Sequence, residues 1–133
     1  MVGEVQVVIH LDTHVVIWLH DGGSKTGRLK RPPYQFKNNP RFISPIVILE
    51  LGLMFEKKRI RIPPSTIVAI VADQFSVQVS KTPFEDLVRH SMDLIWTREP
   101  IDRLIVAAAY ADNAKLFTFD RHILANCPIA FDS

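Results

Sequence analysis

Short apolar runs separated by polar turns divide the chain into alternating strands and helices. Residues 5–11 form a β-branched apolar run, which is typical of a strand buried on both faces. Residues 13–20 are too apolar for a surface helix and too long to continue that strand, so they predict a short buried helix capped by Asp12 or Thr13. Further strands are predicted at 41–43, 77–81, 115–119 and 128–131, and further helices at 45–58, 64–75, 83–95 and 100–112.

Two of these helices have clear local determinants. Ser44 and Pro45 supply an N-cap and a proline at the first helical position. In the segment 83–95, five apolar side chains fall on one helical stripe, which is typical of a helix with one buried face: Phe84, Leu87, Val88, Met92 and Ile95.

The alternation of strands and helices predicts an α/β sandwich around a mostly parallel sheet of four to five strands. We expect residues 1–133 to form a single domain, because this length can bury a sizeable core. Residues 21–40 combine glycines, prolines and asparagines with little periodicity, so we predict a loop with the composition of a mobile segment.

Composition narrows the class of protein. The chain is 47% apolar and 23% charged, as in ordinary globular proteins, and no apolar run approaches the ~18 residues that span a bilayer. Glu4 stands where an export signal would carry a basic residue. The lone Cys127 excludes an internal disulfide and a cysteine-based zinc site. We therefore expect a reduced, cytoplasmic protein without a membrane segment.

The net charge of +2 conceals a basic segment within 22–40. Residues 21–41 carry six basic side chains against Asp21 alone, and a second basic group occupies 57–61. Basic clusters beside an acidic site favour a polyanionic substrate. The alternative for each of these side chains is an ordinary solvated loop.

Four acidic residues lie at element ends or inside apolar runs. Asp12 ends the first strand, Asp120 follows the strand at 115–119, Asp102 lies in the first turn of a helix, and Glu50 interrupts PIVILELGLMF. Burying carboxylates is costly without a compensating positive charge, so the set predicts one cation site at the carboxyl edge of the sheet.

Each acid also has a structural alternative. Asp12 and Asp120 could cap the elements that follow them, and a helix dipole favours any acid at position 102. Glu50 has apolar neighbours three and four positions away, so its alternative is the rim of a subunit interface. The combination therefore carries more weight than any one position.

Other arrangements of acidic or phosphate-binding residues do not fit. A haloacid dehalogenase-type phosphatase needs Asp-x-Asp after its first strand, but the second position here is His14. Paired acids of the receiver-domain type are missing near the first strand, and DGGSKTG does not follow a strand as a phosphate loop would. The five histidines show no metal-ligand spacing.

Together, LDTHVVIWL, SPIVILE, REPIDRLIVAAA and LFTFD resemble the PIN-domain ribonucleases, and within them the VapC-type toxins of toxin–antitoxin pairs. The resemblance covers nearly the whole chain, with 38, 52 and 18 residues between successive acids. It implies a PIN-like three-layer sandwich and cleavage of single-stranded RNA that depends on Mg²⁺ or Mn²⁺. It also implies a homodimer and a cognate antitoxin that inserts a peptide near the site.

Carried over residue by residue, the resemblance makes Asp12, Glu50, Asp102 and Asp120 the acidic quartet and the catalytic, metal-binding residues. The resemblance also implies side chains that lie next to the quartet and support it, with Thr13, Thr118 and Glu99 as candidates; Glu99 stands where the family often has Asp. Candidate RNA contacts are Arg28, Lys30, Arg31, Arg103 and Arg121. The chain departs from the family at 22–40, where many members have a helix that helps to form the antitoxin groove.

Geometry suggests Asp12 and Asp120 as direct metal ligands, with Glu50 and Asp102 acting through water or orienting the nucleophile. The alternative function is a non-catalytic PIN-like module that binds RNA or protein. A nuclease for branched DNA fits less well, because the chain has no added DNA-clamping segments.

Overall fold

The computed structural model describes residues 6–22 and 33–133. Five short strands form one sheet in the order β3-β2-β1-β4-β5, and every neighbouring pair is parallel. The expected α/β sandwich with a mostly parallel sheet is confirmed. The strands are β1 (Ile9–Leu11), β2 (Arg41–Ile43), β3 (Val77–Val79), β4 (Lys115–Phe117) and β5 (Ala130–Phe131).

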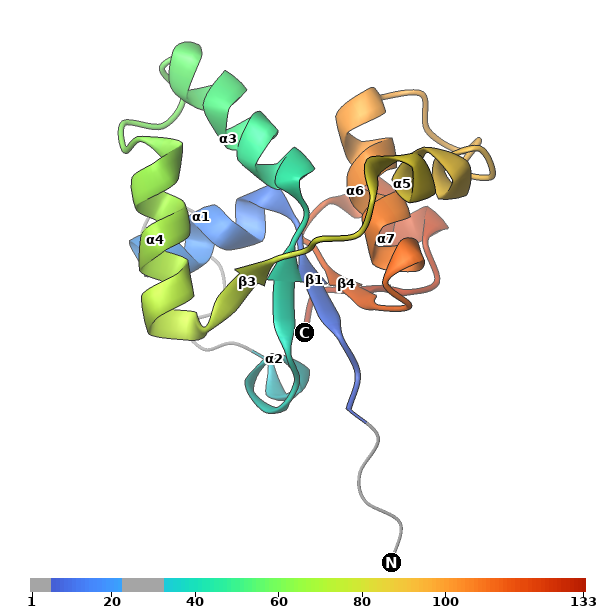
Figure 1. Ribbon diagram of the computed structural model, residues 1–133, viewed down its shortest axis with the longest axis horizontal. Coiled ribbons are helices and arrows are strands. Elements are labelled where there is room, and N and C mark those ends of the chain that lie inside the picture. The colour runs from blue at the N-terminus through green and yellow to red at the C-terminus, as the bar shows by residue number, and fades with distance from the viewer. Residues whose placement is uncertain (1–5, 23–32) are drawn as a thin grey trace, which may run out of the picture.

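Helices cover both sides of this sheet. In Figure 1 they form two groups, with α1, α3 and α4 on the left and α5, α6 and α7 on the right. None of the described helices is both long enough and apolar enough to cross a membrane. The helices are α1 (Thr13–Asp21), α2 (Tyr34–Asn38), α3 (Pro45–Glu56), α4 (Pro64–Phe75), α5 (Phe84–Ser91), α6 (Pro100–Ala111) and α7 (Arg121–Asn126).

The central strand β1 is buried on both faces, as its β-branched sequence predicts. Ile9, His10 and Leu11 are at most 1% exposed. Helix α6 approaches β1 and β4 closely because its middle turn consists of small side chains, Ala107–Ala109, which are fully buried. This packing holds the first turn of α6 near the carboxyl edge of the sheet.

The predicted helix starts after β1 and β2 are confirmed. Oδ1 of Asp12 accepts a hydrogen bond of 2.7 Å from the Thr13 backbone at the start of α1. Ser44 caps α3 in the same way by accepting from the Ile46 backbone at 3.2 Å, and Pro45 occupies the first turn. Both caps lie directly after a strand, so the sheet edge and the helix starts coincide.

Three expectations about the elements were wrong. The segment predicted as a loop over 22–40 contains the helix α2, whereas residues 23–32 lie outside the described part of the chain. Helix α7 was not predicted, because its six residues are too few to show a period. Helix α5 ends at Ser91, and the expected stripe is broken because Phe84, Met92 and Ile95 are 58–81% exposed.

Candidate functional site

Asp12 and Thr118 meet at the carboxyl edge of the sheet because their strands are paired in register. Leu11 pairs with Phe117, so the residues that follow each strand lie side by side. The Thr118 hydroxyl donates a 2.6 Å hydrogen bond to Oδ2 of Asp12, and both side chains are at most 5% exposed. Asp12 is therefore fixed by two donors, one on each carboxylate oxygen.

The same threonine connects Asp12 to Asp120. Oγ1 of Thr118 accepts a 3.0 Å hydrogen bond from the Asp120 backbone. The Asp120 carboxylate caps α7 by accepting from the Ile123 backbone at 2.9 Å. The capping role considered for Asp120 is therefore present, although the element that it caps is a helix and not the expected turn.

Glu50 lies in the middle of α3, on the side of the helix turned towards α1. Its side chain is half-buried, and it lines a groove of about 380 Å³ with residues of α1 and of the loop between α3 and α4. Burial raises the pKa of Glu50, an effect that the Thr13 hydroxyl opposes and the charges of Asp12 and Glu99 reinforce. These influences place Glu50 beside the carboxylates that end the strands.

Asp102 and Glu99 occupy the N-terminus of α6. Glu99 is exposed and caps the helix, accepting from the backbones of Ile101 at 3.2 Å and Asp102 at 2.6 Å. The Glu99 side chain thus folds back onto its own helix. Its charge still acts on the site, because it raises the pKa values of both Glu50 and Asp102.

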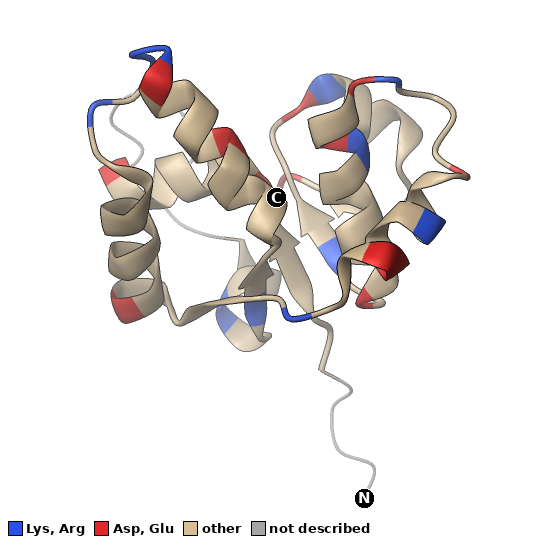
Figure 2. Cartoon of the chain, turned by 45° about the horizontal axis from the view of Figure 1, so that its top comes forward, with Lys and Arg blue, Asp and Glu red and all other residues tan. Residues whose placement is uncertain are grey.

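Electrostatics show how closely the acids converge. Burial raises the pKa of Asp12, against the hydrogen bonds from Thr118 and the Thr13 backbone. Burial also raises the pKa of Asp102 to about 7, and the charges of all four other acids add to this rise: Asp12, Glu99, Asp120 and Glu50. Like charges so close together disfavour ionisation. In Figure 2, acidic positions on α3 and α6 lie on either side of the carboxyl edge.

Such a set of oxygen donors suits a hard divalent cation, which would neutralise the excess negative charge. Oγ1 of the fully buried Thr13 has no hydrogen-bond partner within bonding distance among the described residues, although it lies near enough to Glu50 to stabilise that carboxylate. An unpartnered buried oxygen beside the acids is consistent with a cation site. Among the described residues, however, no three acid, histidine or cysteine side chains lie close enough together to form a complete metal-binding site.

The basic residues that the sequence offers as RNA contacts differ in how far they are engaged within the fold. Arg103 is engaged within the fold, since its guanidinium donates to the backbone oxygens of Ser91 at 2.8 Å and Thr97 at 3.4 Å. Arg121 is exposed at the start of α7, next to Asp120. Arg28, Lys30 and Arg31 lie outside the described residues. The charge distribution around the acids is visible in Figure 2.

A second polar cluster lies away from these acids and was not foreseen. The carboxylate of Asp112 accepts hydrogen bonds from Ser80 at 2.7 Å, from Thr82, and from Nε2 of the buried His10 at 2.6 Å. Burial lowers the pKa of His10 despite the neighbouring carboxylate, which favours the neutral imidazole, and the contact with Asp112 favours the tautomer that carries its proton on Nε2.

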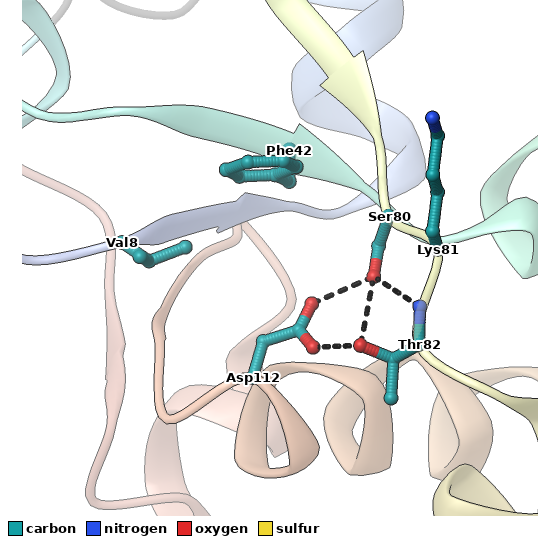
Figure 3. A pocket seen from close by; sticks show the side chains of 6 residues that line it. All are labelled: Val8, Phe42, Ser80, Lys81, Thr82 and Asp112. Carbon is teal, nitrogen blue, oxygen red and sulfur yellow. Dashed lines mark hydrogen bonds between the residues drawn. The ribbon is translucent and has the colours of Figure 1, made fainter.

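Asp112, Ser80 and Thr82 line an open cavity of about 370 Å³. Figure 3 shows these three residues, with the Lys81 side chain directed away from Asp112. None of the five acids of the first site lines this cavity. Because the polar atoms around Asp112 already satisfy one another, the cluster joins β1, α6 and the segment after β3 as a structural network.

Comparisons with known proteins agree with this architecture. Residues 9–127 match the family model for the PIN domain. No curated protein sequence matches the chain. Among solved structures, the VapBC2 complex of Rickettsia felis bound to a DNA fragment from its promoter is similar at 20% identity and a TM-score of 0.61, covering 94% of this chain and 99% of the other.

Two further structures are similar at comparable levels. A toxin–antitoxin complex from Klebsiella pneumoniae has 19% identity and a TM-score of 0.62, over 92% of this chain and 95% of its own. VapBC-1 from nontypeable Haemophilus influenzae has 18% identity and a TM-score of 0.58, over 90% and 91%. At such identities the likeness shows the fold, whereas the family match spans nearly the whole chain. The chain therefore belongs to the PIN domain family.

Proposed function

We propose that this chain is a divalent-metal-dependent endoribonuclease that cleaves RNA phosphodiester bonds as the toxin of a toxin–antitoxin pair. The main support is the convergence of Asp12, Glu50, Asp102 and Asp120 at one edge of a PIN-domain sheet, where burial and then the charges of the neighbouring acids raise the pKa of Asp102 to about 7. Uncompensated carboxylates in this position fit a site that binds Mg²⁺ or Mn²⁺ and a phosphate together.

The residues divide into two roles. Asp12 follows β1 and Asp120 follows β4, and these two residues would hold the cation directly. Thr118 is hydrogen-bonded to both of them and so fixes their relative positions. Glu50 and Asp102 would bind through water or orient the attacking water. Asp102 can hold a proton near neutral pH, which suits a group that exchanges protons with water. A bound divalent cation supplies charge neutralisation at the phosphate and a more acidic water.

Partners follow from the same proposal. The similar structures are VapBC and toxin–antitoxin complexes, which supports a cognate antitoxin as a partner of this chain. Large apolar side chains on α3 are exposed, namely Leu49 at 50%, Leu53 at 37% and Phe55 at 40%. Exposed apolar groups of this size on one helix support a homodimer.

The decisive test compares RNA cleavage by the parent chain and by Asp102→Asn, with RNA 5′ ends mapped after expression in a host. Within the described residues the Asp102 carboxylate accepts no hydrogen bond, so this variant removes charge with little structural change. We expect new 5′ ends with the parent and none with Asp102→Asn or Asp12→Asn. Asp73→Asn, which alters an exposed acid of α4, is the matched control and should cleave as the parent does.

Metal titration separates this function from a non-catalytic RNA- or protein-binding module. By calorimetry, the parent should bind Mn²⁺ below millimolar concentrations, and Asp12→Asn should bind it at least about tenfold more weakly. A parent chain that binds no Mn²⁺ in this range and produces no new RNA ends would favour the non-catalytic module.

A further inference from the structure

The groove that begins at Glu50 is lined by apolar side chains and arginines, which have no role in the acidic site. It lies between α1, α3 and the loop from α3 to α4, and its volume is about 380 Å³. Since Glu50 forms part of its wall, a molecule in the groove would extend directly from the acidic cluster. The volume is at the lower end of the ~300–1,000 Å³ typical of small-ligand sites, which suits a single unit of a polymer.

Five of the ten other residues that line the groove are apolar. Ile17 of α1, Met54 of α3 and Ile67 of α4 line it, together with Ile60 and Ile62 of the connecting loop. Ile62 is 36% exposed, so this wall is accessible from solvent. An aliphatic surface of this kind can bury the flat face of a base without selecting its hydrogen-bonding edge.

Two arginines, Arg59 and Arg61, line the same groove and are exposed. Within the described residues neither forms an ion pair or a hydrogen bond through its guanidinium, although the carboxylates of Glu50 and Asp21 also line the groove. Three other arginines are engaged: Arg41 donates to the Phe75 backbone at 2.8 Å, Arg89 pairs with Asp86 at 3.1 Å, and Arg103 donates to the Ser91 backbone at 2.8 Å. The groove therefore presents two guanidinium groups that remain available for an anion.

We propose that this groove binds the nucleotide next to the cleaved phosphodiester bond, with its base against the aliphatic wall and its backbone phosphate on Arg59 and Arg61. The inference rests on the proposed RNA cleavage and adds a subsite to it. A nucleotide combines a flat apolar group with an anion, as the wall and the two arginines require. Continuity with the acids that would hold the cleaved phosphate favours RNA over a peptide.

Isoleucine methyl groups provide a direct probe, because four isoleucines line the groove. In the chain labelled at isoleucine δ1 methyls, titration with nucleoside 5′-monophosphates should shift the resonances of Ile17, Ile62 and Ile67. Ile95, which is 81% exposed and does not line the groove, is the internal control and should not move. Shifts confined to residues outside the groove would overturn the proposal.

Paired variants test the arginines. Arg59→Ala with Arg61→Ala should weaken binding of a short fluorescent single-stranded RNA at least about tenfold and reduce the slope of log affinity against log salt by about 1.4. Lys57→Ala with Lys58→Ala removes the same charge from the neighbouring end of α3 without altering the groove lining, and should weaken binding less than about threefold. Equal losses in the two pairs would show only long-range attraction and would overturn the subsite.

The outcomes separate the subsite from the proposed function. If the parent cleaves RNA but the arginine pair binds RNA as the parent does, the subsite is wrong and the nuclease stands. If the parent binds RNA through the groove without cleaving it, the nuclease proposal is wrong. The groove is then an RNA-binding site, and the proposal that it holds the nucleotide next to a cleaved bond is also wrong. A hexaglutamate peptide that shifts the groove methyls as strongly as the nucleotides would assign the groove to a protein partner and overturn the proposal.

Discussion

The hydroxyl of Thr118 donates a hydrogen bond of 2.6 Å to Oδ2 of Asp12, joining residues that are 106 positions apart in the chain. The same oxygen accepts from the Asp120 backbone, so one buried side chain connects two of the acids. The hydrogen bond lowers the pKa of Asp12 against the effect of burial. Thr118 therefore helps to keep Asp12 ionised and correctly placed.

Replacement of this hydroxyl should cost both stability and metal affinity. In Thr118→Val the buried Asp12 loses a donor, so the free energy of unfolding should fall by about 1.5–3 kcal/mol, as for hydrogen bonds to charged groups. The pKa of Asp12 should rise further, which weakens Mn²⁺ binding near neutral pH. Urea unfolding and calorimetry measure the two effects. Thr66→Val, at an exposed position of α4, is the control, and an equal effect there would contradict this role.

Asp102 should make the metal-free chain less stable as pH rises. Its folded pKa of about 7 exceeds the ordinary value of 3.8, so the folded chain binds a proton that the unfolded chain releases. The resulting stabilisation is fully present below the ordinary value and is lost as pH rises through about 7. Urea unfolding in chelator should therefore give a lower free energy at pH ~8 than at pH ~6, because Asp102 ionises across this interval.

Asp102→Asn removes this titration and is the matched comparison. Its stability in chelator should exceed that of the parent at pH ~8, and the difference should shrink towards pH ~5, since the parent carboxyl is then protonated. Added Mn²⁺ should stabilise the parent more than the variant. A variant with the same pH dependence as the parent would show that Asp102 does not carry the raised pKa.

The sequence could predict the acids because each stands in an improbable place. Glu50 lies among apolar neighbours on α3, and Asp12 ends a strand buried on both faces. Their convergence was an inference from the carboxyl ends of parallel strands, and the register of Leu11 with Phe117 shows why it holds for Asp12 and Thr118. Caps and metal ligands use the same side chains, so the sequence alone could not separate the roles of Asp12 and Asp120.

The errors have different physical causes. The stripe at 83–95 has helical spacing, but Arg103 binds the Ser91 backbone oxygen where α5 ends, and Met92 and Ile95 are exposed. Helix α7 depends on its Asp120 cap, which a short sequence window cannot distinguish from a turn. The partner of His10 is 102 positions away, and no local pattern predicts it. Each error concerns a long-range contact or a short element.

The network around Asp112 should contribute strongly to stability. In Asp112→Ala the buried Nε2 proton of His10 loses its acceptor, as do the hydroxyls of Ser80 and Thr82. Leaving buried donors unsatisfied costs about 1–3 kcal/mol each, so we expect a loss of at least about 3 kcal/mol in urea unfolding. Asp73→Ala, at an exposed position of α4, should change stability by less than about 0.5 kcal/mol. Comparable losses in both variants would contradict a specific network.

The end of α4 offers a stabilising substitution. Ser76 adopts the left-handed conformation, with φ of 55°, while its backbone N–H closes the helix by donating to Val71. A side chain in this region costs roughly 1–2 kcal/mol, so Ser76→Gly should raise the free energy of unfolding by about 0.5–1 kcal/mol after the greater freedom of the unfolded chain is included. Ser65→Gly makes the same chemical change in the first turn of the same helix, where glycine should lower stability by about 0.5 kcal/mol. Thermal unfolding of the two variants should therefore move the midpoint in opposite directions, and a decrease for Ser76→Gly would mean that the backbone at this position relaxes away from the left-handed conformation.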